Sequence, residues 1–244
     1  MLNAFLIALR EGFEAALIVG ILVAYLVKTD RRSRLRPLWI GVSSAIVASF
    51  AFGAILTSID NELSAKGEVI FAGATSLLAA GLVTWMIFWM KKTARSLKNE
   101  LQGKLDSAIM AGPFAIAITA FLSVAREGLE TVLFLYSSFK SSNEAPSAIL
   151  GLSLGLAVAV ALGIAIYAGA LRLNLSKFFT ITGVALIVVV ANVLMYGIHE
   201  IGELGWIPES KAMEYFVGGA YFVATLFFYL RAPRKVEQRE LANA

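Results

Sequence analysis

Residues 69–90 read VIFAGATSLLAAGLVTWMIFWM, which is 22 consecutive positions without a charged side chain. A helix rises about 1.5 Å per residue, so about 20 apolar residues span the hydrocarbon core of a bilayer. Three further charge-free stretches of that length occupy residues 38–59, 148–171 and 178–198. These four segments predict membrane-spanning helices.

Three more stretches complete the predicted fold. Residues 2–27 and 110–139 are apolar apart from one compact charge cluster each, and residues 213–230 are shorter, with Glu214 near their start. The sequence therefore predicts an all-α integral membrane protein with seven transmembrane helices in residues 1–231, followed by a cytoplasmic tail at 232–244. Because the first stretch contains Arg10, Glu11 and Glu14, we expect a membrane helix there and no cleavable signal peptide.

The overall composition agrees with a membrane protein. Apolar residues make up 59% of the chain and charged residues only 16%, which is far from the balance of a soluble domain. The chain has no cysteine, so disulfides, thiolate metal sites and thiol catalysis are excluded. Neither a nucleophile with a base nor a nucleotide motif is found, and no enzymatic activity is expected.

Basic residues alternate between the connections. The first, third and fifth connections and the tail hold 16 Lys and Arg residues, whereas the opposite connections hold three, Lys66, Lys140 and Lys211. The positive-inside rule then places the N-terminus outside and the C-terminus in the cytoplasm of a cell membrane. Because the basic residues lie in short loops, they indicate membrane orientation and no nucleic-acid partner.

Two segments repeat one pattern at a constant offset of 116. FLIALREGFE at 5–14 and FLSVAREGLE at 121–130 share Phe, Leu, Arg, Glu, Gly and Glu. By the orientation above, the two helices that carry them run in opposite directions. The repeat predicts that helices 1–3 and 4–6 form an inverted repeat with helix 7 added, an architecture common among transporters.

Each repeat carries charges at the middle of a predicted span. Charged groups there are costly unless they face one another, water or an ion. The acidic members of each repeat stand three apart and share a helix face, which predicts a converging metal site of Glu11, Glu14, Glu127 and Glu130. Arg10 and Arg126 are expected to orient these carboxylates.

Carboxylate oxygens suit hard cations, so Mg, Ca, Mn, Fe(II) and Fe(III) all remain open from the chemistry. Two alternatives also stay open. The charges are either salt bridges that lock two helices together or a proton relay, and the relay is compatible with metal transport. Gly12 and Gly128 are expected to leave room for backbone approach or for the ion.

The doubled Arg-Glu-Gly-x-Glu motif, Arg10 to Glu14 and Arg126 to Glu130, resembles the signature of the iron permease family, which includes bacterial ferrous-iron transporters and fungal oxidase-dependent iron permeases. Further similarity lies in residues 82–92, in 172–175 and in His199-Glu200. The resemblance implies uptake of Fe2+ or Fe3+ as substrate, with the motif glutamates as ligands and without a prosthetic group.

The resemblance also implies partners in addition to the lipid bilayer: an extracytoplasmic oxidase, peroxidase or iron-binding protein. A homo-oligomer is left open. Two other functions are weighed beside iron import. One is a permease for another divalent metal such as Mn2+ or Pb2+, and the other is an iron-binding membrane subunit that transports nothing.

A second acidic group lies near the outer end of the predicted sixth helix. His199, the only histidine of the chain, is followed by Glu200 and Glu203. We expect these three residues to form an outer entry site, with a solvated acidic loop as the alternative reading.

Overall fold

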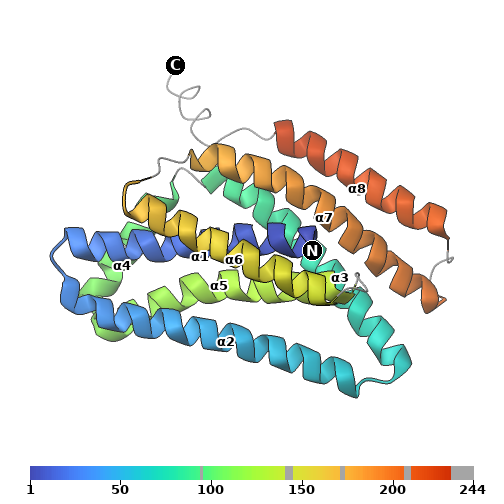
Figure 1. Cartoon of the computed structure of the whole chain (residues 1–244), viewed down its shortest axis with the longest axis horizontal. Helices are drawn as coiled ribbons and strands as arrows, with labels where there is room; N and C mark the ends of the chain where they lie inside the picture. Colours follow the sequence, from blue (N-terminus) through green and yellow to red (C-terminus); the bar gives the residue numbers. More distant parts are fainter. Residues whose placement is uncertain (94–95, 141–144, 171–173, 206–209, 232–244) are drawn as a thin grey trace. The chain divides into compact units, whose positions relative to one another are not determined.

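The computed structural model describes residues 1–93, 96–140, 145–170, 174–205 and 210–231. The predicted tail at 232–244 lies outside them. Every regular element in these ranges is helical, as Figure 1 shows. The helices are α1 Leu2–Lys28, the 3-10 turn η1 Arg32–Arg34, α2 Leu35–Glu62, α3 Ala65–Thr93, α4 Leu97–Ala111, α5 Pro113–Lys140, α6 Ala145–Tyr167, α7 Leu175–Glu203 and α8 Lys211–Arg231.

Within the described ranges, five helical segments are long and apolar enough to cross a membrane. They are Arg32–Asp60, Lys66–Thr93, Pro146–Tyr167, Leu175–Glu203 and Lys211–Arg231. The helices α1 and α5 have comparable lengths, 27 and 28 residues, and each carries the three charged residues of its motif. The chain is thus an all-helical, multi-pass membrane protein.

Most helices extend beyond the apolar stretches that predict them. For example, α3 covers Ala65–Thr93, whereas its charge-free stretch covers 69–90, and Lys91 and Lys92 form part of its last turn. Long basic side chains at helix ends reach the interface while their aliphatic stems stay on apolar surface. Hydropathy therefore locates the apolar centre of these helices and underestimates the length of most of them, whereas the stretch 148–171 extends past the end of α6 at Tyr167.

The helix α4 was not predicted, because it lies in what the sequence pattern treats as a basic connection. Its apolar residues recur at about every fourth position, and Leu97, Leu101, Leu105 and Ala108 are buried. The Tyr25 hydroxyl of α1 donates to the Asp106 carboxylate at 2.7 Å and ties the end of α1 to α4. The helix ends at Gly112, whose φ of 109° favours glycine, and α5 begins with Pro113, a residue suited to a first helical turn.

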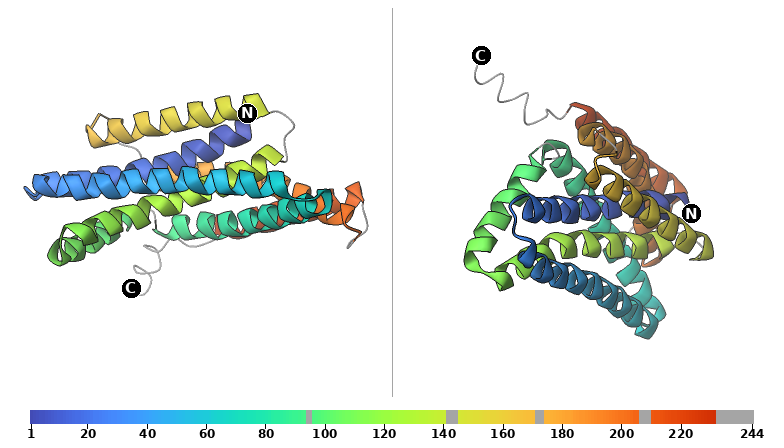
Figure 2. Two further views of the ribbon diagram at one scale, coloured as in Figure 1. Left: turned by 90° about the horizontal axis from the view of Figure 1, so that it is seen from below. Right: turned by 60° about the vertical axis from the view of Figure 1, so that its left-hand side comes forward.

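The described chain forms two compact units. Unit 1 comprises Met1–Thr57, Ser96–Leu135 and Glu144–Leu173, and unit 2 comprises Ser58–Arg95, Tyr136–Asn143 and Asn174–Ala244. In unit 1, α1, α2, α5 and α6 run side by side in both Figure 1 and Figure 2.

In unit 1, α6 packs closely on α1. Gly151 lies against Met1, and Gly163 lies against Ala16, where an added Cβ would meet the Ala16 methyl at 2.7 Å. Small residues at such positions let helices approach closely in a membrane. The contacts advance together along both helices, so α1 and α6 run parallel.

The helix α2 packs on α5 in the same manner. Gly41 lies against Ala117, and Gly53 lies against Val132. These contacts repeat those of α6 on α1. The glycines of α2 at 41 and 53 lie 110 positions before the glycines of α6 at 151 and 163. Their partners on α5 at 117 and 132 lie 116 positions after the partners of α6 at 1 and 16. The two helix pairs of unit 1 therefore share one packing pattern, and α2 and α5 also run parallel.

Unit 2 is built on α3 and α7, which run antiparallel. Gly73 of α3 faces Gly197 of α7, and Gly183 of α7 faces Ile87 of α3. The same shift of 110 positions relates these two contacts: position 73 of α3 corresponds to 183 of α7, and position 87 of α3 corresponds to 197 of α7. The helix α8 packs antiparallel on α7, with the buried Tyr229 donating from its hydroxyl to the Phe179 carbonyl at 3.0 Å.

Candidate metal centre

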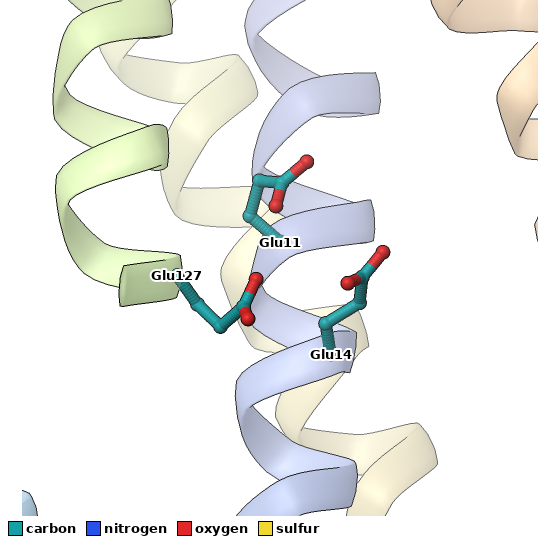
Figure 3. Close-up of side chains that lie close together, drawn as sticks. All are labelled: Glu11, Glu14 and Glu127. Atoms are coloured by element: carbon teal, nitrogen blue, oxygen red, sulfur yellow. The ribbon is translucent and has the colours of Figure 1, made fainter. Parts of the chain in front are cut away.

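The metal centre lies in unit 1, where the middles of α1 and α5 face each other. Glu11 and Glu14 project from α1 and Glu127 projects from α5, and Figure 3 shows their three carboxyl groups close to one another beside α1. All three are buried, with exposed fractions of 1%, 0% and 4%. The three-residue spacing within each motif, together with the pairing of the two helices, places these carboxyl groups together.

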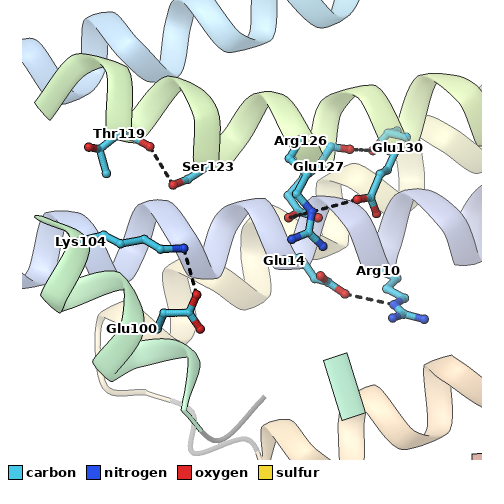
Figure 4. A network of polar contacts seen from close by, with 10 residues as sticks. Arg10, Glu14, Glu100, Lys104, Thr119, Ser123, Arg126, Glu127 and Glu130 are labelled. Atoms are coloured by element: carbon cyan, nitrogen blue, oxygen red, sulfur yellow. Dashed lines mark hydrogen bonds and ion pairs between the residues drawn. The ribbon is translucent and has the colours of Figure 1, made fainter. Parts of the chain in front are cut away.

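Each arginine forms an ion pair with the second glutamate of its own motif. Arg10 Nε lies 3.1 Å from Glu14 Oε1, and Arg126 Nε lies 3.0 Å from Glu130 Oε1 (Figure 4). Both pairs span four residues, one helical turn. Because a buried carboxylate is stable only when its charge is compensated, these contacts fix the positions of Glu14 and Glu130.

Several carboxylate oxygens in the centre receive no hydrogen bond from the described part of the chain. These are both oxygens of Glu11 and Oε2 of Glu14, Glu127 and Glu130. A buried polar atom left without a partner costs about 1–3 kcal/mol, and more when it is charged. The centre therefore presents acceptor oxygens without matching donors, which is the arrangement that a cation satisfies.

The geometry brings three of the four predicted ligands together. One oxygen from each of Glu11, Glu14 and Glu127 lies within 4.8 Å of the others. Glu130 stands beside this group on α5, held by Arg126, and is close enough to interact electrostatically with Glu11 and Glu14. The donor set is all oxygen, which fits a hard or borderline cation.

The motif glycines serve helix packing. A Cβ on Gly12 would lie 2.9 Å from Leu156 Cδ1 and 3.1 Å from Ala159 Cβ, both on α6. Gly128 lies against Ser49 of α2 in the corresponding way. The space at each motif glycine is thus occupied by side chains of a neighbouring helix, α6 at Gly12 and α2 at Gly128.

The second predicted group surrounds His199 in unit 2. The helix α7 continues to Glu203, so His199 and Glu203 lie one turn apart, with Nε2 3.4 Å from Oε1. On the other side, His199 Nδ1 lies 3.0 Å from Glu214 Oε1 of α8. Glu200 faces α3 instead, near Gly73, and is hydrogen-bonded to Tyr196.

Glu214 is therefore a partner of His199 that the sequence pattern did not include. Its only signal was an acidic residue in the first turn of the next helix, where negative charge is favourable. The contact depends on how α8 folds back on α7, which no local pattern encodes.

Fold and site together define a class of protein: a multi-pass helical membrane protein with a buried carboxylate cluster between two of its helices. Comparison with known proteins identifies the family within this class. The profile of the "Iron permease FTR1 family" matches residues 1–216, and the chain belongs to this family. It is a permease-family protein and not an enzyme.

Named relatives are similar over most of the chain. The "Ferrous iron permease EfeU" of Yersinia pestis is 37% identical over 208 residues, which cover 84% of this chain and 73% of the relative. The protein of the same name from Escherichia coli O6:H1 (strain CFT073) is 38% identical over 208 residues, covering 84% of this chain and 75% of the relative. No solved structure matches the chain significantly.

Proposed function

We propose that this protein imports ferrous iron across the cell membrane through the carboxylate cluster of α1 and α5. The observation that carries the proposal is the convergence of Glu11, Glu14 and Glu127, with buried oxygens that accept no hydrogen bond from the residues that the structure describes. Family membership and the name of the relatives support iron as the substrate.

The charge of the centre favours a divalent ion. When ionised, the four motif glutamates carry four negative charges and the two arginines carry two positive charges, which leaves −2. A divalent cation neutralises this charge, whereas a trivalent ion leaves an excess positive charge in a low-dielectric interior. The net charge therefore favours Fe2+ over Fe3+ as the species bound in the membrane.

The structure also suggests how the roles divide. Among the described residues, none donates a hydrogen bond to either oxygen of Glu11 or to Oε2 of Glu127, so these two glutamates bind the ion directly in this proposal. Glu14 and Glu130 are each held by an arginine through one oxygen and offer the other. Arg10 and Arg126 position carboxylates and do not touch the ion.

Seven spans with the N-terminus outside form part of the proposal. The directions of contacting helices support seven crossings, with α4 outside the count. The parallel pairs α1–α6 and α2–α5, and the antiparallel pairs α3–α7 and α7–α8, agree with strict alternation of seven spans. The recurrent shifts of 110 and 116 support the inverted repeat of helices 1–3 and 4–6.

Residues 1–231 then form the permease domain, and residues 232–244 form a cytoplasmic tail. An extracytoplasmic oxidase, peroxidase or iron-binding protein that delivers iron at the outer face remains an expected partner. A permease for Mn2+ or Pb2+ and a non-transporting iron-binding subunit are the competing functions.

Flux through purified protein separates these functions. In proteoliposomes loaded with a chelator, we expect saturable uptake of radiolabelled Fe2+ that exceeds uptake of Fe3+, and an inward proton gradient tests the energy source. Stronger uptake of Mn2+ or Pb2+ than of Fe2+ would assign another substrate. Binding of Fe2+ without any flux would identify the non-transporting subunit.

We further propose that the His199 group is a weak entry site at the outer ends of α7 and α8. Glu203 and Glu214 flank His199 from two helices, and Glu200 lies one turn from Tyr196 on the same segment of α7. Acidic side chains near a pore entrance raise the local concentration of cations.

For this entry site we expect the double variant Glu203→Gln, Glu214→Gln to raise the KM for Fe2+ by roughly threefold to tenfold, because capture weakens while the buried centre is unchanged. The maximal rate should change little. Glu62→Gln, which alters an exposed residue at the end of α2, is the control. An unchanged KM in the double variant would make the group a solvated loop.

A further inference from the structure

The second motif helix carries a polar stripe that leads away from the metal centre. The stripe consists of Thr119, Ser123, Arg126 and Glu130. The last three follow Thr119 by four, seven and eleven positions, so all four lie on one side of α5, as Figure 4 shows. All four side chains are partly exposed in a helix whose middle lies in the membrane. The stripe extends from the centre toward Pro113, where α5 begins.

The exposure of Arg126 implies that water reaches this stripe. One third of its side chain is exposed, although it lies at the centre of a 28-residue helix. A guanidinium at that depth is stable next to water or protein and costly next to lipid. Glu130, its ion-pair partner, is 12% exposed.

The hydroxyl groups of the stripe have the polarity that a cation requires. Ser123 Oγ donates its only proton to the Thr119 carbonyl at 2.7 Å, and Thr119 Oγ1 donates to the Ala115 carbonyl at 2.8 Å. Because each proton is used within the helix, the lone pairs of each hydroxyl remain as acceptors. They offer oxygen ligands to a passing hydrated ion.

The corresponding side of α1 is closed. At the offset of 116, Ser123 corresponds to Ile7, which is completely buried, and Arg126 corresponds to Arg10, whose side chain is 1% exposed. Two helices with the same motif therefore differ on one side of the centre: α1 is sealed by an apolar residue, and α5 is polar and partly open.

From these observations we infer that Ser123 and Thr119 line a water-filled passage along α5 between the carboxylate centre and the end of the helix at Pro113. In the proposed orientation this end faces the cytoplasm, so the passage is the inner half of the ion route. This assignment rests on the proposed function, whereas the presence of water along the stripe does not.

The same residues also have a purely structural explanation, because Ser and Thr side chains often hydrogen-bond to their own helix and face lipid without a functional role. The two readings differ in access to water. The chain lacks cysteine, so single cysteines can be introduced without altering a background of thiols.

The experiment uses full-length protein in sealed membrane vesicles of both orientations, without iron, and a charged, membrane-impermeant methanethiosulfonate. We expect Thr119→Cys and Ser123→Cys to react from the cytoplasmic side. Leu122→Cys, on the neighbouring apolar stripe with 62% exposure, and Ile7→Cys should react about tenfold more slowly or not at all, because the reagent requires a hydrated thiolate.

A rate for Ser123→Cys no faster than that for Leu122→Cys from either side would overturn the inference, and so would reaction only from the outer side. Because the assay contains no iron, rapid labelling in a protein that moves no iron would refute the proposed function alone.

A second measurement asks whether the passage carries the ion. Ser123→Val should lower the rate of Fe2+ uptake several-fold while the affinity of the purified protein for Fe2+ stays unchanged, because the centre is intact. Ser153→Val is the matched control, since Ser153 makes the same bond to its own helix, with Oγ 2.9 Å from the Ile149 carbonyl, on an exposed face of α6. Equal uptake by both variants would remove Ser123 from the route.

Discussion

Replacing Glu11 by Gln is expected to lower Fe2+ uptake by at least about 100-fold, since the loss of a group that only orients a metal ligand already costs about 10- to 100-fold. Gln keeps the shape of the side chain and removes its charge. Within the described part of the chain, neither oxygen of Glu11 accepts a hydrogen bond, so the substitution removes no such contact. The substitution therefore tests metal binding with little effect on folding.

The measurement is uptake of radiolabelled Fe2+ into proteoliposomes, together with Fe2+ affinity of the purified protein. Glu100→Gln is a matched control, because Glu100 pairs with Lys104 on the surface of α4. Glu127→Gln should behave like Glu11→Gln. If both variants of the centre transport iron at near the wild-type rate, the carboxylates are structural and the proposed route is wrong.

Replacing Arg10 by Met is expected to destabilise the protein by about 3–5 kcal/mol, since it leaves the buried Glu14 carboxylate without its partner. Arg126→Met should cost less, because the Arg126 side chain is one third exposed and solvent screens its pair. Thermal unfolding of the purified proteins in one detergent measures the difference.

The double variant Arg10→Met, Glu14→Leu is the decisive control for the arginine prediction. Replacing both members of a buried pair by apolar residues is often neutral or stabilising, so stability should recover while iron transport stays lost. Equal thermal stability of Arg10→Met and the wild type would show that Arg10 does not hold Glu14 in place.

The helices of this protein follow from local sequence. Inside a bilayer the backbone must satisfy its own hydrogen bonds, so an apolar stretch of sufficient length becomes a helix wherever it lies in the fold. Five of the seven predicted stretches fall within observed helices. The stretch 110–139 begins in the last turn of α4 and crosses Gly112 before α5, and the stretch 148–171 continues past the end of α6 at Tyr167. The amphipathic helix α4 was not predicted, because only its face with Leu97, Leu101 and Leu105 is apolar. A search for long apolar runs does not detect such a pattern.

Part of the candidate site also follows from sequence. Charges that are costly at a helix centre must find partners, which singled out the two motifs and their shared offset. The sequence predicts that each arginine pairs with a neighbouring carboxylate. In the structure the shortest contact of Arg10 and of Arg126 is with the glutamate one turn onward, and Arg126 also lies 3.8 Å from Oε1 of the adjacent Glu127. Spacing alone could not distinguish Glu11 from Glu14 or Glu127 from Glu130.

By itself, then, the sequence determined the helical class, the apolar segments and the four glutamates, because each depends on the composition of a short stretch. Only the tertiary structure decided that Glu11, Glu14 and Glu127 converge while Glu130 stays beside Arg126. It also decided that His199 meets Glu214. These outcomes depend on the rotation of each helix about its axis, which is set by packing against helices distant in sequence, such as Gly12 of α1 against α6.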